Sequence, residues 1–176
     1  LGESSVYFAL KGAEVYFNDI SPKMGEFAEK LATKHGVKLN YLIAPIEHLQ
    51  LHKEFFDIIY CANLMHHVPK QDQEMWIKTM SESLANDGVL VTIDPLKYNP
   101  AINYYRTKAE EVRTIDEDYF IRRYNPNEIR YWKRIFKEKE SQIGWWFNPL
   151  KWIDKLLLSL PGIKKLAWNI VIVAKK

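Results

Sequence analysis

The sequence predicts an α/β protein with a mostly parallel sheet and helices on both of its faces. Short apolar runs rich in β-branched residues alternate with segments of helical periodicity, as in strands joined by helical crossovers. The run at 56–60 is almost wholly apolar, which is typical of a strand buried on both faces of a parallel sheet. Strands are expected at 13–19, 37–44, 56–60, 89–94, 139–146 and 168–174, and helices at 3–10, 21–36, 70–84, 102–112, 127–136 and 150–160.

Local signals mark the ends of several of these elements. Gly12 suits the residue that follows a helix in left-handed conformation. Ser21 and Pro22 suit the N-cap and the first position of the next helix, which Gly36 ends. Residues 86–88 read Asn-Asp-Gly and predict a turn before the strand at 89–94.

Composition indicates one globular domain over residues 1–176, with 47% hydrophobic and 27% charged residues. No apolar run approaches the roughly 20 residues that span a bilayer. The single cysteine, Cys61, lies in an apolar run and is interpreted as a structural thiol in a reducing, cytoplasmic compartment. Charge is uneven: residues 1–96 carry a net −5, whereas residues 97–176 carry a net +8 and five of the six tryptophans.

Small and polar residues follow the apolar run at 56–60. They include Ala62, Asn63, His66 and His67. Ligands of open α/β sheets bind beyond the carboxyl ends of the strands, so these residues are candidates for a site. Adjacent histidines point apart and have no partner at ligand spacing, so no metal site is predicted.

The order and spacing of these segments resemble a class I S-adenosylmethionine-dependent methyltransferase of the small-molecule type. The resemblance implies a Rossmann-like sheet with an antiparallel last strand and S-adenosyl-L-methionine as cofactor. It covers nearly the whole chain, strongly over 1–95. The segments that carry it are Gly2 with the helix after it, GAEVYFNDISPKM (12–24), PIEHL (45–49), FFDIIYCANLMHHV (55–68), LANDGVLVTIDP (84–95) and WNIVIVAKK (168–176).

The resemblance assigns cofactor roles around the second strand of the family's fold. Asp19 would accept hydrogen bonds from both ribose hydroxyls, or else serve as a charge at a helix N-terminus. Ile20 and Met24 would lie near the adenine or ribose, although Met24 equally suits a plain core position. Gly2 would let the backbone approach the methionine end of the cofactor.

Further cofactor contacts are expected after the third and fourth strands of the family's fold. The family often has an adenine-binding acid where this chain has Pro45, so the backbone of Ile46 or the side chain of Glu47 would take that role. Glu47 also suits a solvated loop charge. Ala62 and Asn63, after the fourth strand, complete the expected cofactor set.

The family's glycine-rich loop and first strand would precede Gly2. In the family the first strand lies between the second and fourth, so without it two interior strand edges would lack a ladder partner. The sequence is therefore expected to be an N-terminally truncated methyltransferase-like domain.

His66 and His67 are the candidate general bases, because histidine titrates near neutrality. Asp94, at the end of the strand at 89–94, is a weaker candidate for the same role. The alternative is that one of them packs against or caps the following helix. The expected acceptor is a small molecule, hydrophobic or lipid-like, with residues 97–176 forming the acceptor side or lid. The apolar stretch at 145–160 either contacts a membrane surface peripherally or packs on the sheet as core.

Two rival functions remain open from the sequence. A catalytically inactive methyltransferase-like binding or scaffold module would fit a chain without cofactor residues. A nucleic-acid methyltransferase would fit the basic half. However, the residues after the fourth strand read Asn63-Leu64-Met65-His66 rather than Asn/Asp-Pro-Pro-aromatic, so no nucleic-acid partner is predicted.

Overall fold

The computed structural model describes residues 2–49, 51–96, 98, 100, 104, 128–132, 147–167 and 169–176. The chain divides into two units, residues 1–51 and 52–176, which are described in turn. The predicted strand at 139–146 and, apart from Tyr104, the predicted helix at 102–112 lie outside the described residues.

The first unit is a parallel strand pair joined by a helical crossover. Its strands β1 and β2 pair in parallel, with Asp19 opposite Ile43. This confirms the crossover predicted from the helical periodicity of residues 21–36. The elements are α1 (Glu3–Leu10), β1 (Tyr16–Asp19), α2 (Pro22–Lys34), β2 (Asn40–Ile43) and the 3-10 turn η1 (Ile46–His48).

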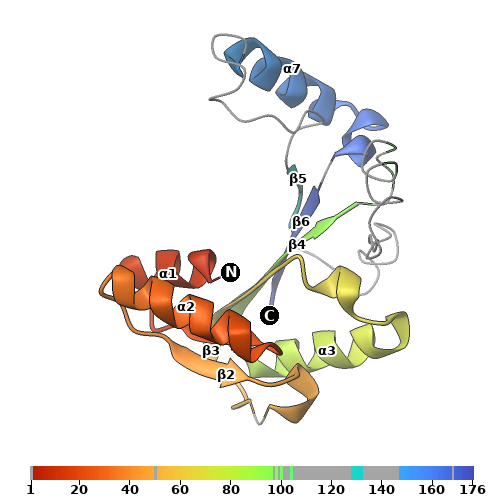
Figure 1. The fold of residues 1–176 in the computed structure, drawn as a ribbon. Helices are drawn as coiled ribbons and strands as arrows, with labels where there is room; N and C mark the ends of the chain where they lie inside the picture. Colours follow the sequence, from red (N-terminus) through yellow and green to blue (C-terminus); the bar gives the residue numbers. More distant parts are fainter. Residues whose placement is uncertain are drawn as a thin grey trace. The chain divides into compact units, whose positions relative to one another are not determined.

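Helices α1 and α2 lie side by side (Figure 1) and approach closely at one point. Gly2, the residue before α1, has φ +85°, and a Cβ placed there would lie 2.8 Å from the Cβ of Ala28. Ala28 and Ala32 of α2 are buried. Small residues are therefore needed where the two helices meet.

The second unit contains a four-stranded sheet of order β3-β4-β6-β5. Strands β3 and β4 are parallel, whereas β6 is antiparallel to both β4 and β5. The predicted fold class and its antiparallel last strand are confirmed. The elements are β3 (Phe56–Ala62), η2 (Met65–His67), α3 (Lys70–Ser83), β4 (Leu84–Pro95), β5 (Glu128–Trp132), α7 (Phe147–Ser159), η4 (Ile163–Leu166) and β6 (Asn169–Lys175).

Two expectations about this unit are wrong. The segment predicted as a helix at 127–136 contains β5, because pairing with β6 overrides its local preference. Strand β3 is not buried on both faces: Ile58 is 56% exposed. Among the described strands β3 has one ladder partner, β4, which makes it an edge strand.

A turn interrupts the start of β4. Leu84 pairs with Phe56 and Val89 with Ile58, so residues 85–88 bulge out of the ladder. Asp87, in this bulge, has φ +67°. The turn predicted at 86–88 is thus present, although it lies within the strand.

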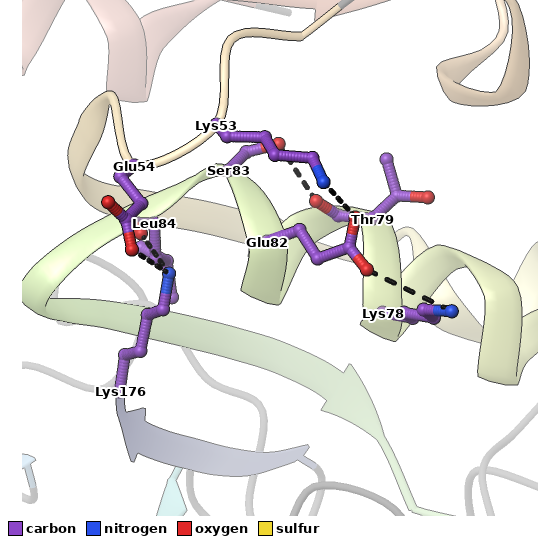
Figure 2. A network of polar contacts seen from close by, with 8 residues as sticks. All are labelled: Lys53, Glu54, Lys78, Thr79, Glu82, Ser83, Leu84 and Lys176. Atoms are coloured by element: carbon purple, nitrogen blue, oxygen red, sulfur yellow. Dashed lines mark hydrogen bonds and ion pairs between the residues drawn. The ribbon is translucent and has the colours of Figure 1, made fainter.

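Lys176 connects the end of the last strand to the start of β4 through hydrogen bonds and an ion pair (Figure 2). Its ammonium donates to the carbonyl of Leu84 at 2.8 Å and lies 3.6 Å from a carboxylate oxygen of Glu54. Its backbone N–H donates to the carbonyl of Gly88. The flanking contacts of Glu82 with Lys53 and Lys78, each at 3.9 Å, are exposed, so each contributes at most about 1 kcal/mol.

Helix α7 is amphipathic and is followed closely by η4. Its predicted extent, 150–160, is largely confirmed. Within the described residues, no helix has the length and apolar character needed to cross a bilayer.

Candidate cofactor and catalytic sites

Asp19 lies at the carboxyl end of β1 and is partly buried. Its Oδ1 accepts the backbone N–H of Ser21 at 2.9 Å, which closes the turn into α2. Ser21 holds the N-cap position as predicted but makes no side-chain capping bond. One carboxylate oxygen of Asp19 therefore orders the turn. To contact the ribose as predicted, the same carboxylate would have to accept hydrogen bonds from the ribose as well as from Ser21.

An exposed apolar side chain follows the carboxylate directly. Ile20 is 68% exposed, although it comes straight after a strand, and Met24 of α2 is half-buried. The side chain of Asn18 donates to the carbonyls of Leu42 and Ala44, at 2.7 and 2.9 Å, and so joins the ends of β1 and β2. The sequence analysis missed Asn18. This end of the unit presents an acid and an accessible apolar surface on consecutive residues.

The turn after β2 holds the remaining candidates of the first unit. Ile46 is buried, so only its backbone can face a ligand, whereas the side chain of Glu47 is exposed. Gly2 has the left-handed conformation that glycine tolerates best, and Ala28 occupies the space beside it.

In the second unit, β3 ends in a sharp turn. Asn63 has φ +54°, and its N–H donates to the carbonyl of Ile93 at 2.7 Å. Both Ala62 and Asn63 are exposed at the carboxyl end of the strand. The conformation follows from the small and polar residues that the sequence places there.

The two neighbouring histidines have different environments. The Nδ1 of His66 lies 2.9 Å from Oδ1 of Asp94, and the two side chains are only 7% and 1% exposed. The backbone N–H of His66 donates to the same oxygen at 3.3 Å. His67 is exposed, and its ring centroid lies 4.0 Å from that of His66. The geometry therefore distinguishes His66 as the oriented member of the pair.

Gln73 of α3 supports the turn that carries His66. Its side-chain amide donates to the carbonyls of Met65 and Val68, at 3.2 and 3.0 Å, and the residue is buried. Sequence reasoning missed Gln73. Gln73 could have been identified from the sequence as a polar residue on the inward-packing face of the predicted helix at 70–84.

Cys61 lies within β3 beside this cluster. It is buried, and its Sγ lies 3.5 Å from Sδ of Met80. Burial, and secondarily the charge of Asp94, raises the pKa of the Cys61 thiol to about 12. A thiol that stays protonated is a poor nucleophile, so a structural role fits this site.

This thiol gives the stability of the protein a defined pH dependence. The ordinary pKa of a cysteine thiol is 9.0, whereas that of Cys61 in the folded protein is about 12. Between these values the unfolded chain binds fewer protons, so the free energy of unfolding falls as pH rises, by up to about 1.4 kcal/mol per pH unit. We expect Cys61→Ala to remove this contribution in urea unfolding measured from pH 8 to 11. Equal slopes for both proteins would contradict the buried thiol.

Within the described residues, no cluster of three His, Cys, Asp or Glu side chains could hold a metal ion.

Comparison with known proteins identifies the family. Residues 1–88 match the profile of a family described as a methyltransferase domain, so the chain belongs to this family. The chain also has the fold of S-adenosylmethionine-dependent methyltransferases of known structure. No curated protein sequence matches the chain.

Solved structures of low sequence identity share the fold. An S-adenosylmethionine-dependent methyltransferase from Archaeoglobus fulgidus has a TM-score of 0.67 and 16% identity, over 99% of this chain and 81% of its own. One from Methanosarcina mazei has a TM-score of 0.69 and 16% identity, over 98% and 86%. The [4+2]-cyclase SpnF has a TM-score of 0.66 and 12% identity, over 99% and 70%.

Proposed function

We propose that this protein transfers a methyl group from S-adenosylmethionine to a small acceptor. The observation that carries the proposal is the Asp19 carboxylate at the end of β1, followed by the exposed Ile20, in a chain of the methyltransferase domain family. A carboxylate can accept two hydroxyl hydrogen bonds, and an accessible isoleucine can cover an aromatic base. These residues fit a nucleoside cofactor.

The remaining residues have narrower roles in this proposal. Gly2 would contribute its backbone groups, and the buried Ile46 would contribute main-chain groups. When bound, the cofactor supplies a methyl group on a positively charged sulfur. The proposed cofactor contacts in the first unit are Gly2, Asp19, Ile20, Met24, Ile46 and Glu47. For Ala62 and Asn63, in the second unit, the contact remains a prediction from the sequence.

Fold similarity alone does not decide the reaction, since a [4+2]-cyclase shares this fold. The sequence also leaves open an inactive module that binds a partner. Cofactor binding and methyl transfer distinguish these functions, because a scaffold needs neither. Variants of Asp19 separate cofactor recognition from fold maintenance.

Asp19→Ala is expected to weaken S-adenosylmethionine binding by about 1.5–3 kcal/mol, since hydrogen bonds to a charged group are lost. Asp19→Asn serves as the matched variant. Its amide oxygen can still accept the Ser21 N–H, but it no longer offers a carboxylate to two hydroxyls. Calorimetry on the complete protein should therefore find both variants weakened. Full affinity in Asp19→Asn would show that Asp19 only orders the turn. If the unaltered protein did not bind S-adenosylmethionine, the proposed methyl transfer would be rejected.

Helix α7 supports the proposal of a hydrophobic or lipid-like acceptor reached at a membrane surface. Trp152 and Leu156 of α7 are 65% and 49% exposed, and Leu160, directly after the helix, is 43% exposed. Lys155 is exposed in the same helix, and Lys164 follows in η4. An apolar stripe with lysines nearby suits an anionic lipid surface. The other residues of the predicted contact at 145–160 include Trp145 and Trp146, which lie outside the described residues.

Co-sedimentation with phosphatidylserine vesicles tests this surface. We expect Trp152→Ser/Leu156→Ser to reduce the vesicle-bound fraction at least about tenfold, because each lost apolar side chain removes about 1.5–3 kcal/mol of burial. Tyr7→Ser/Leu10→Ser, a pair of exposed apolar residues on α1, is the control and should bind like the unaltered protein. Unchanged binding in the α7 variant would reject the membrane contact.

A further inference from the structure

His66 and Asp94 meet because two neighbouring parallel strands end together. Ala62, the last residue of β3, lies opposite Ile93 of β4. Asp94 is therefore one residue further along β4, and η2 returns His66 to it across the turn at Asn63. The contact joins residues 28 apart in sequence.

The chemistry of the pair fixes where the proton lies. An ionised carboxylate can only accept hydrogen bonds, so Nδ1 of His66 must carry the hydrogen that points to Asp94. In the neutral ring the lone pair is then on Nε2, for which the described residues provide no hydrogen-bond partner.

The position of the ring is determined from two further directions. Asp94 Oδ1 also accepts the backbone N–H of His66, so the carboxylate holds both ring and main chain. The side-chain amide of Gln73 donates hydrogen bonds to the carbonyls of Met65 and Val68, which lie on either side of the histidine in sequence. The ring therefore has one orientation that is fixed without help from a ligand.

The buried contact between His66 and Asp94 is expected to add little to the stability of the fold. Oδ2 of Asp94 and Oε1 of Gln73 are buried without a hydrogen-bond partner among the described residues. A buried ionic pair seldom stabilises a fold more than apolar residues of similar size, and unpaired buried oxygens oppose folding. Orientation of an imidazole is the property that the arrangement supplies and an apolar core would not.

We infer that Asp94 is a positioning residue that holds His66 as a general base, and that the methyl acceptor carries a proton on the oxygen or nitrogen that attacks. The inference rests on the proposed methyl transfer and specifies its acceptor. A hydroxyl or amine fits this site. A carboxylate does not, because it has no proton to lose and would bring negative charge towards the buried Asp94.

In the proposed step, a lone pair of the acceptor oxygen or nitrogen forms a bond to the methyl carbon while the carbon–sulfur bond breaks. The electron pair of that bond stays on sulfur, which becomes a neutral thioether. The acceptor's proton moves to Nε2 of His66, and the imidazolium that forms is stabilised by Asp94 before it releases the proton to water.

The test uses tritium-labelled methyl S-adenosylmethionine with the complete protein and a small-molecule extract of the cells that make it. Methyl esters release labelled methanol in mild base, whereas methyl ethers and methylamines do not. The expected product is stable to base. Released methanol would identify a carboxylate acceptor and overturn the inference while leaving the proposed methyl transfer intact. No transfer to any component, despite cofactor binding, would reject both.

Variants of the pair test the role of Asp94 itself. We expect His66→Gln and Asp94→Asn each to lower kcat at neutral pH by about 10²–10⁴-fold, the range for removing a general base or disturbing its tautomer. Affinity for S-adenosylmethionine should not change. The deficit should shrink at high pH, where the acceptor loses its proton unaided. His52→Gln, on an exposed histidine, is the control and should match the unaltered protein.

A merely structural pair would give another result. The variants would then lose cofactor affinity, and their rates would fall by one factor at every pH. That outcome would overturn the positioning role.

Discussion

Replacing Gly2 by alanine is expected to lower the free energy of unfolding of the unit at residues 1–51 by about 2–5 kcal/mol. Two causes add. A non-glycine residue held in left-handed conformation, here φ +85°, costs about 1–2 kcal/mol. The new Cβ would also meet the Cβ of Ala28 at 2.8 Å, and such overpacking costs about 1–3 kcal/mol. Helix α1 would have to move away from α2.

Gly12→Ala separates the two causes. Gly12 has φ +90° but no atom within 4 Å of an added Cβ, so only conformational strain should appear. Hydrogen exchange of the α1 and α2 amides measures both variants in the same unit. Equal losses of protection in Gly2→Ala and Gly12→Ala would show that α1 does not pack on α2 as closely as the structure indicates.

Elements set by local signals were predicted well from the sequence. The Ser-Pro start and the Gly36 stop gave the helix that the structure places at Pro22–Lys34. The left-handed conformation at Gly12 and the Asp87 turn also followed from the residue types. In each case the cause lies within a few residues of the feature.

Features that depend on distant segments were not predictable in the same way. Residues 128–132 form a strand only because β6 pairs with them. The exposure of Ile58 depends on how many neighbours β3 has in the sheet, which its own apolar run does not reveal.

The candidate site shows the same division. The run after β3 identified His66 and His67 but could not rank them, since the partner, Asp94, is 28 residues away. Asp19 was identified from the end of its strand. Its bond to Ser21, which competes with the proposed ribose contact, emerged only from the geometry of the turn.

His66→Leu is expected to destabilise the unit at residues 52–176 by about 3–5 kcal/mol at pH 7. Without His66, the buried carboxylate of Asp94 loses the ring N–H that donates to it, and its charge is left without compensation. Asp94 is 1% exposed and already has an unpaired Oδ2. Urea unfolding should show a lower midpoint with an unchanged slope.

The double variant His66→Leu/Asp94→Leu makes the prediction specific to the pair. With both polar groups replaced by apolar ones, no charge remains buried, so the double variant should be more stable than His66→Leu alone. Contacting residues commonly show coupling of about 0.5–3 kcal/mol in such a cycle. If the two leucine substitutions instead destabilise additively, the 2.9 Å contact contributes no coupling, and the loss in His66→Leu reflects packing of the ring. A recovery in stability combined with loss of turnover would mean that the pair serves the reaction at the expense of the fold, as its unpaired oxygen suggests.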